Sequence, residues 1–95
     1  MICSSELDSV IRSFTEAYQW RKEHLVEDDH SRLALEHALA SAYLGDRRIK
    51  EAIRMLEHVV AVEKKTLAED DDSRLASERT LTYALQMANQ DGVYR

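Results

Sequence analysis

Apolar residues recur at helical spacing over most of this 95-residue chain, and they predict four helices. Residues three and four apart lie on the same side of an α-helix, so a stripe with that spacing marks a face that packs on a core. One stripe comprises Ile49, Ala52, Ile53, Leu56, Val59 and Val60, and another comprises Leu33, Leu39, Ala40 and Tyr43. We expect helices near residues 6–24, 31–45, 48–66 and 73–89. Two glycines and no proline are too few turn-forming residues for a many-stranded β fold, so the predicted class is all-α.

The chain contains an internal repeat with an offset of 42 residues. The segment LVEDDHSRLA at residues 25–34 recurs as LAEDDDSRLA at residues 67–76. Over residues 25–43 against 67–85 the two copies share 11 identities in 19 positions. Self-similarity at a fixed period of this length is typical of helical repeat proteins, in which each repeat is one supersecondary unit.

The same offset predicts one complete repeat and two half repeats within a single domain, residues 1–95. Residues 25–66 form the complete repeat. Residues 6–24 correspond to the second helix of a preceding repeat, and residues 67–95 contain the first helix of a following one. Because a two-helix unit cannot cover its own apolar face, neighbouring units stack on one another. We therefore predict antiparallel helix pairs stacked as an α-solenoid fragment, with a buried set comprising Leu33, Leu39, Tyr43, Leu56 and Val59.

The two outer helices are expected to present apolar faces that no other helix of the chain covers. Such faces are a large apolar exposure for a small protein, and a second copy could bury them. We therefore expect a homodimer or a higher homo-oligomer. The residues predicted to mediate self-association are Ile11, Phe14 and Tyr18 on the first helix and Leu75, Leu81 and Leu85 on the last.

Two acidic clusters, Asp28–Asp29 and Asp70–Asp72, directly precede the second and fourth predicted helices. Carboxylates at that position accept hydrogen bonds from the free N–H groups of the first turn. Neither cluster has the glycine that a calcium-binding loop needs for its sharp turn, so capping is the favoured interpretation. The four histidines lack the spacing of a zinc site, and we expect neither a metal nor a cofactor.

The sequence offers no pattern of residues that would support catalysis. A G-x-S-x-G turn is absent, and so is a glycine-rich phosphate loop, so we expect no enzymatic activity. The 18 acidic residues outnumber the 13 basic ones, which makes nucleic acid and anionic membranes poor partners. No apolar run is long enough to span a bilayer, and the amino terminus does not look like a signal peptide. The single cysteine, Cys3, cannot form an internal disulfide, and these features together favour a cytoplasmic protein.

Several segments resemble the 42-residue tetratricopeptide repeats of kinesin light chain type. They are residues 39–43 (LASAY), 49–52 (IKEA) and 56–60 (LEHVV), which match the first-helix, turn and second-helix signature. Residues 65–70 (KTLAED) with 74–77 (RLAS) are similar to one branch, the carboxyl-terminal arrays of fungal NACHT or NB-ARC receptor-like proteins. The chain departs from the family at Arg47, where the family has glycine, and at His30 and Asp72, where it has proline.

The resemblance implies a non-catalytic scaffold that binds a peptide or a partner helix. In such arrays the first helices of successive repeats line a concave surface. Carried over by position, that surface would use Ala34, His37, Ser41 and Leu44, followed by Arg79, Tyr83 and Gln86. Self-association through the half repeats is the alternative function.

Overall fold

The computed structural model describes residues 4–90 and residue 92, and these form four α-helices. The helices are α1 (Ser4–His24), α2 (His30–Gly45), α3 (Ile49–Thr66) and α4 (Asp72–Gln90). Their ends lie within two residues of the predicted ends. The described residues contain no strand, so the all-α prediction is confirmed.

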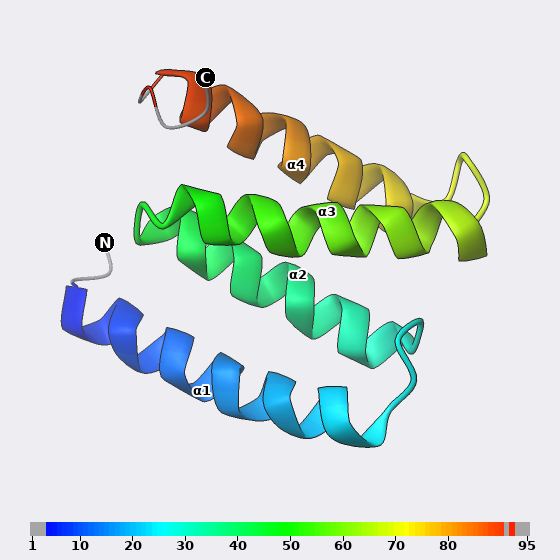
Figure 1. The fold of residues 1–95 in the computed structure, drawn as a ribbon, viewed down its shortest axis with the longest axis horizontal. Helices are drawn as coiled ribbons and strands as arrows, with labels where there is room; N and C mark the ends of the chain where they lie inside the picture. The colour runs from blue at the N-terminus through cyan, green and yellow to red at the C-terminus, as the bar shows by residue number, and fades with distance from the viewer. Residues whose placement is uncertain (1–3, 91, 93–95) are drawn as a thin grey trace.

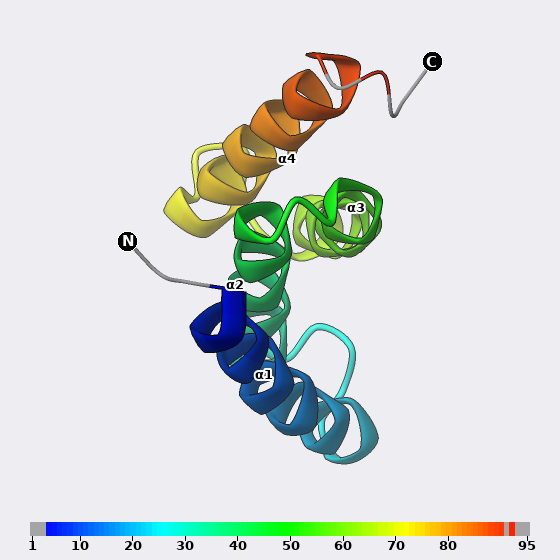
Figure 2. The same cartoon turned by 90° about the vertical axis from the view of Figure 1, so that its left-hand side faces the viewer.

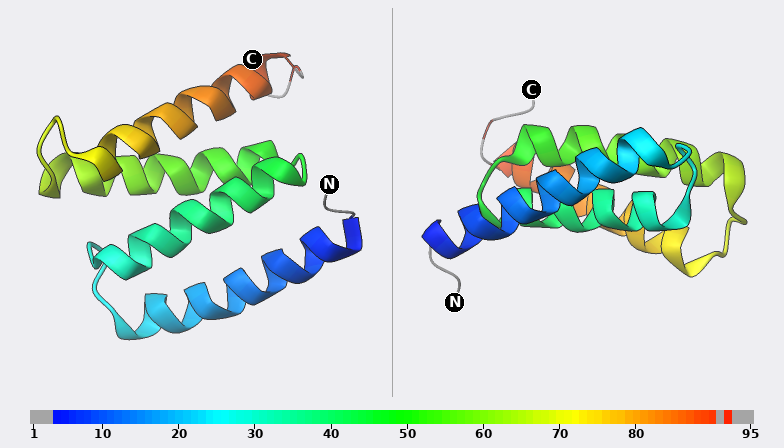
Figure 3. Two further views of the ribbon diagram at one scale, coloured as in Figure 1. Left: turned by 180° about the vertical axis from the view of Figure 1, so that it is seen from behind. Right: turned by 90° about the horizontal axis from the view of Figure 1, so that it is seen from below.

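The helices pack in chain order, each antiparallel to the next (Figure 1). The view turned by 90° places α3 to one side of α2 and α4 (Figure 2). The view from behind in Figure 3 shows the same succession, with α1 packed on α2. Because helices alternate in direction, α2 and α4 run the same way and lie next to each other across the layer. They correspond to the two helices that the 42-residue offset predicts to be the first helices of successive repeats.

Helix α3 lies at the centre of the core because apolar residues cover more than one of its sides. Its stripe packs against α2 on one side and α4 on the other. Alanines at the contacts let the helix axes approach closely, since a methyl group takes little space. The main buried cluster comprises Ala40, Leu44, Ile49, Ala52, Ile53, Leu56, Ala84 and Ala88. A second cluster joins Leu33 to Val59 and Val62.

Four of the five predicted core residues are buried, whereas Tyr43 is less buried than predicted. Tyr43 is only half-buried and packs against the edge of the main cluster. It lies in the last turn of α2, where the guanidinium carbon of Arg48 lies 4.5 Å from its ring centroid. Near a helix end fewer neighbours surround a side chain, so the Arg48 guanidinium covers the part of the ring that the core does not.

The acidic clusters cap their helices in the same way in both repeats, as predicted. Asp29 Oδ1 accepts the Arg32 backbone N–H at 3.0 Å, and Asp71 Oδ1 accepts that of Arg74 at 3.2 Å. The pKa of Asp29 is lowered, first by the Ser31 hydroxyl that donates to its carboxylate. Both arginines also donate from Nη1 to the carbonyl oxygen seven residues earlier, at 3.2 Å. The repeated sequence therefore forms the same hydrogen bonds in both linkers.

The turn between α2 and α3 ends in a Schellman motif with a non-glycine residue at its left-handed position. Arg48 N–H donates to the Tyr43 carbonyl at 2.9 Å, and Arg47 N–H donates to that of Leu44 at 3.1 Å. Arg47 has φ 62°, a conformation in which a Cβ is strained. The departure of the sequence from glycine at this position therefore has a direct structural cost.

Replacing Arg47 by glycine should stabilise the protein by about 0.5–1 kcal/mol, because removing Cβ relieves more strain than the added chain entropy offsets. Thermal unfolding followed by circular dichroism measures the gain. Arg47→Ala is the matched control, since it removes the same side chain and keeps the Cβ. Equal melting temperatures for the two variants would show that backbone strain at residue 47 is negligible.

Candidate functional site

A groove runs along the surface between α2 and α4, and it contains two hollows. The first lies between the amino-terminal halves of the two helices and has a volume of about 360 Å³. The second lies between their carboxyl-terminal halves and has a volume of about 370 Å³. The first hollow is lined by His30, Leu33, Ala34, His37, Ala38, Glu63, Ser73, Ala76 and Ser77. The second is lined by Ser41, Leu44, Gly45, Thr80, Tyr83 and Met87.

His37 separates the two hollows and links α2 to α4. Its Nε2 lies 3.2 Å from Thr80 Oγ1, and its Nδ1 lies 3.4 Å from Ser77 Oγ. Ser77 is completely buried, so the imidazole supplies its hydroxyl with a partner inside the protein. Both ring nitrogens are therefore engaged, and this side chain holds the floor of the groove in one arrangement.

The structure brings together most of the side chains predicted for the concave surface. Ala34 and His37 line the first hollow, and Ser41, Leu44 and Tyr83 line the second. Tyr83 is 57% exposed and stands at the surface, whereas Leu44 is 8% exposed and belongs to the floor. Leu44 therefore offers little area to a ligand, because the main core cluster already covers it.

Two further predicted residues on α4, Arg79 and Gln86, are exposed and line neither hollow. They lie on the same helix as Tyr83, and their sequence spacing alone could not show which of the three points into the groove. Contact between them and a bound partner stays a prediction.

The side chains predicted for self-association are less open than expected. Ile11 is 6% exposed, because α1 turns it toward α2, so its expected availability was wrong. Leu81 and Leu85 pack against the main core cluster and are also only partly exposed. Three more members of the set are half-buried: Phe14, Tyr18 and Leu75. Self-association itself stays a prediction.

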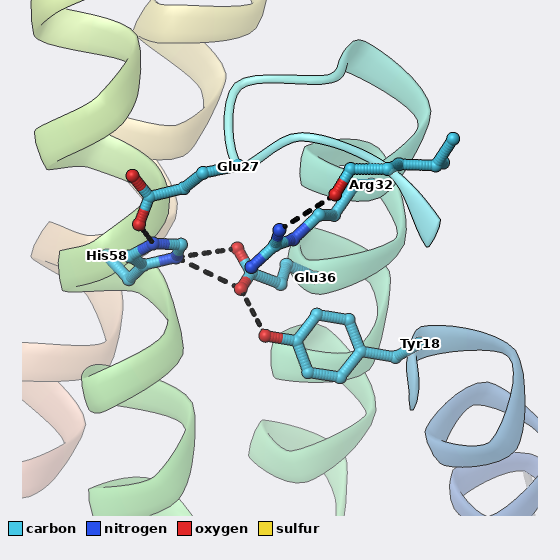
Figure 4. A network of polar contacts seen from close by, with 6 residues as sticks. Tyr18, Glu27, Arg32, Glu36 and His58 are labelled. Atoms are coloured by element: carbon cyan, nitrogen blue, oxygen red, sulfur yellow. Dashed lines mark hydrogen bonds and ion pairs between the residues drawn. The ribbon is translucent and has the colours of Figure 1, made fainter. Parts of the chain in front are cut away.

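A polar network that the sequence pattern did not predict joins α1, α2 and α3 around Glu36 (Figure 4). Glu36 is 2% exposed, and its Oε1 accepts the Tyr18 hydroxyl at 2.6 Å. His58 Nδ1 lies 2.9 Å from Glu36 Oε2, and His58 Nε2 lies 2.7 Å from Glu27 Oε2. The Arg32 guanidinium lies beside this group in Figure 4.

The available sequence signal was the recurrence of Glu36 at Glu78, 42 residues later. It did not reveal the partners, because Tyr18 and His58 come from helices far along the chain. Glu78 instead accepts a hydrogen bond from Arg74 on its own helix, at 3.3 Å. The same sequence position therefore has different neighbours in the two copies.

The network shifts the pKa of three titrating groups, raising those of Tyr18 and His58 and lowering that of Glu27. Burial and the neighbouring Glu36 carboxylate raise the pKa of Tyr18 to about 12. Burial lowers the pKa of His58, but hydrogen bonds to Glu27 and Glu36 outweigh it and raise the pKa overall. The hydrogen bond to His58 lowers the pKa of Glu27. A protonated imidazole can donate from both nitrogens to the two carboxylates, so the network acts as a structural brace between helices.

Protonation of His58 should make the protein more stable in mild acid than in mild alkali. Its folded-state pKa lies above the unfolded value of about 6.5, so its contribution is complete below that value and is lost as pH rises through the folded pKa. Melting temperature measured from about pH 5.5 to 8.5 should fall for the wild type and stay flatter for His58→Gln. Parallel curves for the two proteins would assign the pH dependence to other groups.

The described residues provide neither a cluster of metal ligands nor a membrane-spanning helix. No group of three or more His, Cys, Asp or Glu side chains in that part of the chain is placed to hold a metal ion. Within the same residues, every helix is too short or too polar to cross a bilayer.

Comparison with solved structures relates the fold to a known repeat architecture. No protein-family model matches the sequence, and no curated protein sequence does. A crystal structure of nearly identical TPR-like repeats, described as a kinesin light chain of Podospora anserina, has a TM-score of 0.86 and 34% identity. The alignment covers 90% of this chain and 41% of the matched one. A variant of the same repeats has a TM-score of 0.84 and 35% identity, and its alignment covers 90% of this chain and 40% of the matched one. The four helices therefore adopt a TPR-like α-solenoid fold, and the chain spans about 40% of the length of these structures.

Proposed function

We propose that the α2–α4 groove binds an extended segment of another protein and that the chain is a non-catalytic scaffold. The observation that carries the proposal is the alignment of two hollows along one groove, bridged by His37 and Thr80. The groove lies between the first helices of successive repeats, which is the arrangement that solenoids use to build long binding surfaces. The likeness to TPR-like repeats supports the same function.

The dimensions of the groove fit a short extended peptide. The hollows are lined by α2 residues around Ala34 and around Leu44, ten residues apart. At 1.5 Å per residue this separation is roughly 15 Å, a distance that about five extended residues span. Side chains on one side of an extended peptide can therefore enter both hollows, and a peptide of about eight residues would cover the groove.

A displayed library of eight-residue peptides, selected against the whole chain, tests this function. Selected peptides should bind Ser41→Trp at least about tenfold more weakly than the wild type, because the indole would fill the second hollow at an exposed position. Thr82→Ala is the matched control, since Thr82 is exposed on α4 and lines neither hollow. Selected peptides that bind Ser41→Trp and wild type equally well would place the binding surface elsewhere.

Self-association is the second candidate, and a difference between the repeats favours it. Leu33 is buried by Val59 and Val62 of α3, whereas its counterpart Leu75 on α4 is only half-buried. Among the described helices only α3 and α2 contact α4, so its other side has no cover there. A second copy could supply it. Sedimentation velocity over a dilution series should then show a dimer that dissociates on dilution, and a monomer at all concentrations would contradict this candidate.

The context proposed for the chain is a repeat array of a fungal NACHT or NB-ARC receptor-like protein in the cytoplasm. The support is the similarity of residues 65–70 and 74–77 to that branch. Sequencing the gene around this reading frame tests it. An in-frame ATPase domain upstream would agree with the proposal, and a reading frame with no such domain would contradict it.

A further inference from the structure

Glu63 is a buried carboxylate with one oxygen that lacks a hydrogen-bond partner. It is 4% exposed, and its Oε1 has no hydrogen-bond partner. The residue belongs to α3 and lines the first hollow of the groove. A buried carboxylate oxygen that has lost its water and has no hydrogen-bond partner costs free energy. A hydrogen-bond donor from outside the chain would therefore be stabilising here.

The equivalent residue of the preceding repeat shows what this position can do. Arg21 lies 42 residues before Glu63. Its Nη1 donates to the Ser31 carbonyl oxygen at 3.0 Å, across the contact between α1 and α2. Ser73, the counterpart of Ser31, lines the hollow together with Glu63. The same position therefore carries an arginine with a hydrogen-bond partner in one repeat and a glutamate with an unpartnered oxygen in the next.

Among the described residues, no lysine or arginine lines the hollow beside Glu63. The ring nitrogens of His37 are already engaged by Thr80 and Ser77. Glu63 also lies near the carboxyl-terminal end of α3, where the helix dipole disfavours a negative charge. A carboxylate in this setting gains most from a positively charged donor.

The hollow has room and a further acceptor for such a donor. Small side chains, Ala34, Ala38 and Ala76, line it beside the hydroxyl of Ser73, while the buried Ser77 hydroxyl is already paired with His37. A guanidinium is planar, carries five N–H donors and is weakly hydrated, so it can donate to a carboxylate and to a hydroxyl oxygen at once. An ammonium group is more strongly hydrated and loses more on leaving water.

We propose that the first hollow is a binding site for an arginine side chain of the bound protein segment, with Glu63 as its counter-charge. This inference deepens the proposed function and rests on it, because it names the chemistry that the α2–α4 groove selects. The second hollow then accepts a neighbouring side chain of the same segment. A basic segment also complements a chain whose net charge is −5.

Titration of Nα-acetyl-L-arginine amide into the ¹⁵N-labelled chain tests the site directly. The backbone signals of Ser73, Ser77 and Glu63 should shift, while the neutral citrulline analogue, which has nearly the same shape, should leave them unchanged. Glu63→Gln should weaken arginine binding at least about tenfold. Glu57→Gln, an exposed carboxylate on the same helix, is the matched control and should bind like the wild type. Equal binding of arginine and citrulline, or full binding by Glu63→Gln, would overturn the proposal.

A second variant covers the case in which Glu63→Gln does not fold. Ala34→Arg places a tethered guanidinium at an exposed position on the rim of the hollow. It should abolish binding of the added arginine amide, and undiminished binding would again overturn the proposal. Library peptides that bind the groove without preferring arginine over citrulline would contradict this inference and leave the proposed function standing. Arginine binding at Glu63 combined with peptide binding insensitive to Ser41→Trp would contradict the proposed function alone.

Discussion

Leu56→Ala should lower the free energy of unfolding by about 2–5 kcal/mol, the range for emptying a leucine site in a packed core. Leu56 is 0% exposed and lies in the main cluster, where α3 meets α2 and α4. A domain of this size has a total stability of roughly 5–15 kcal/mol, and the lower part of that range applies to small domains. The substitution would therefore lower the melting temperature by roughly 10 °C or more.

Urea unfolding monitored by circular dichroism measures this loss. Glu57→Ala, one residue further along α3 and exposed, is the control and should change stability by no more than about 0.5 kcal/mol. Similar losses for the two variants would mean that α3 does not lie at the centre of the core. Truncating the half-buried Tyr43 should cost less than truncating Leu56, since a side chain at the edge of the core leaves a smaller cavity.

His58→Leu should destabilise the protein by about 2–3 kcal/mol at pH 6, because it removes a charged donor from a carboxylate that stays buried. Glu36 would keep the Tyr18 hydroxyl as a partner and lose both contacts with the imidazole. His30→Leu is the control, since His30 is exposed and lies outside the network. Thermal unfolding of both variants at pH 6 gives the comparison.

A double variant shows whether the buried charge is the cause. Glu36→Leu in the His58→Leu background should recover part of the lost stability, because an apolar side chain needs no counter-charge in this place. Tyr18 would still lose its acceptor, so recovery should be incomplete. If the double variant is less stable than His58→Leu alone, the cost arises from lost packing and not from the uncompensated carboxylate.

Local pattern accounts for the agreement between prediction and structure at the level of helices. Helical spacing of apolar residues, such as Ile49, Ile53 and Leu56, depends on the chain only over a few residues. Capping by Asp29 and Asp71 is also local, because donor and acceptor lie within three residues. The repeat added the one long-range fact available in the sequence, namely that α2 and α4 occupy equivalent places.

Equivalence of the repeats was also enough to predict much of the candidate groove. Ser41 and Tyr83 stand at the same position of successive repeats, 42 residues apart, and both line the second hollow. Positions that repeat along a solenoid lie on the same side of it, so the groove follows from the period. The period does not show whether a side chain in the groove is exposed or buried in its floor. Leu44 is buried because the main core cluster packs against it.

The fold class, the four helices and their caps could be predicted from the sequence, because each depends on residues close together in the chain. Which polar groups become buried, and which partners they meet, depends on how the helices pack. Glu36 meets Tyr18 and His58, 18 and 22 residues away, while its repeat counterpart Glu78 bonds along its own helix. Glu63 of α3 is buried in a similar way, at a hollow whose other lining residues come from α2 and α4. Burial and charge pairing depend on which helices pack against a residue, and the local sequence around that residue does not predict those helices.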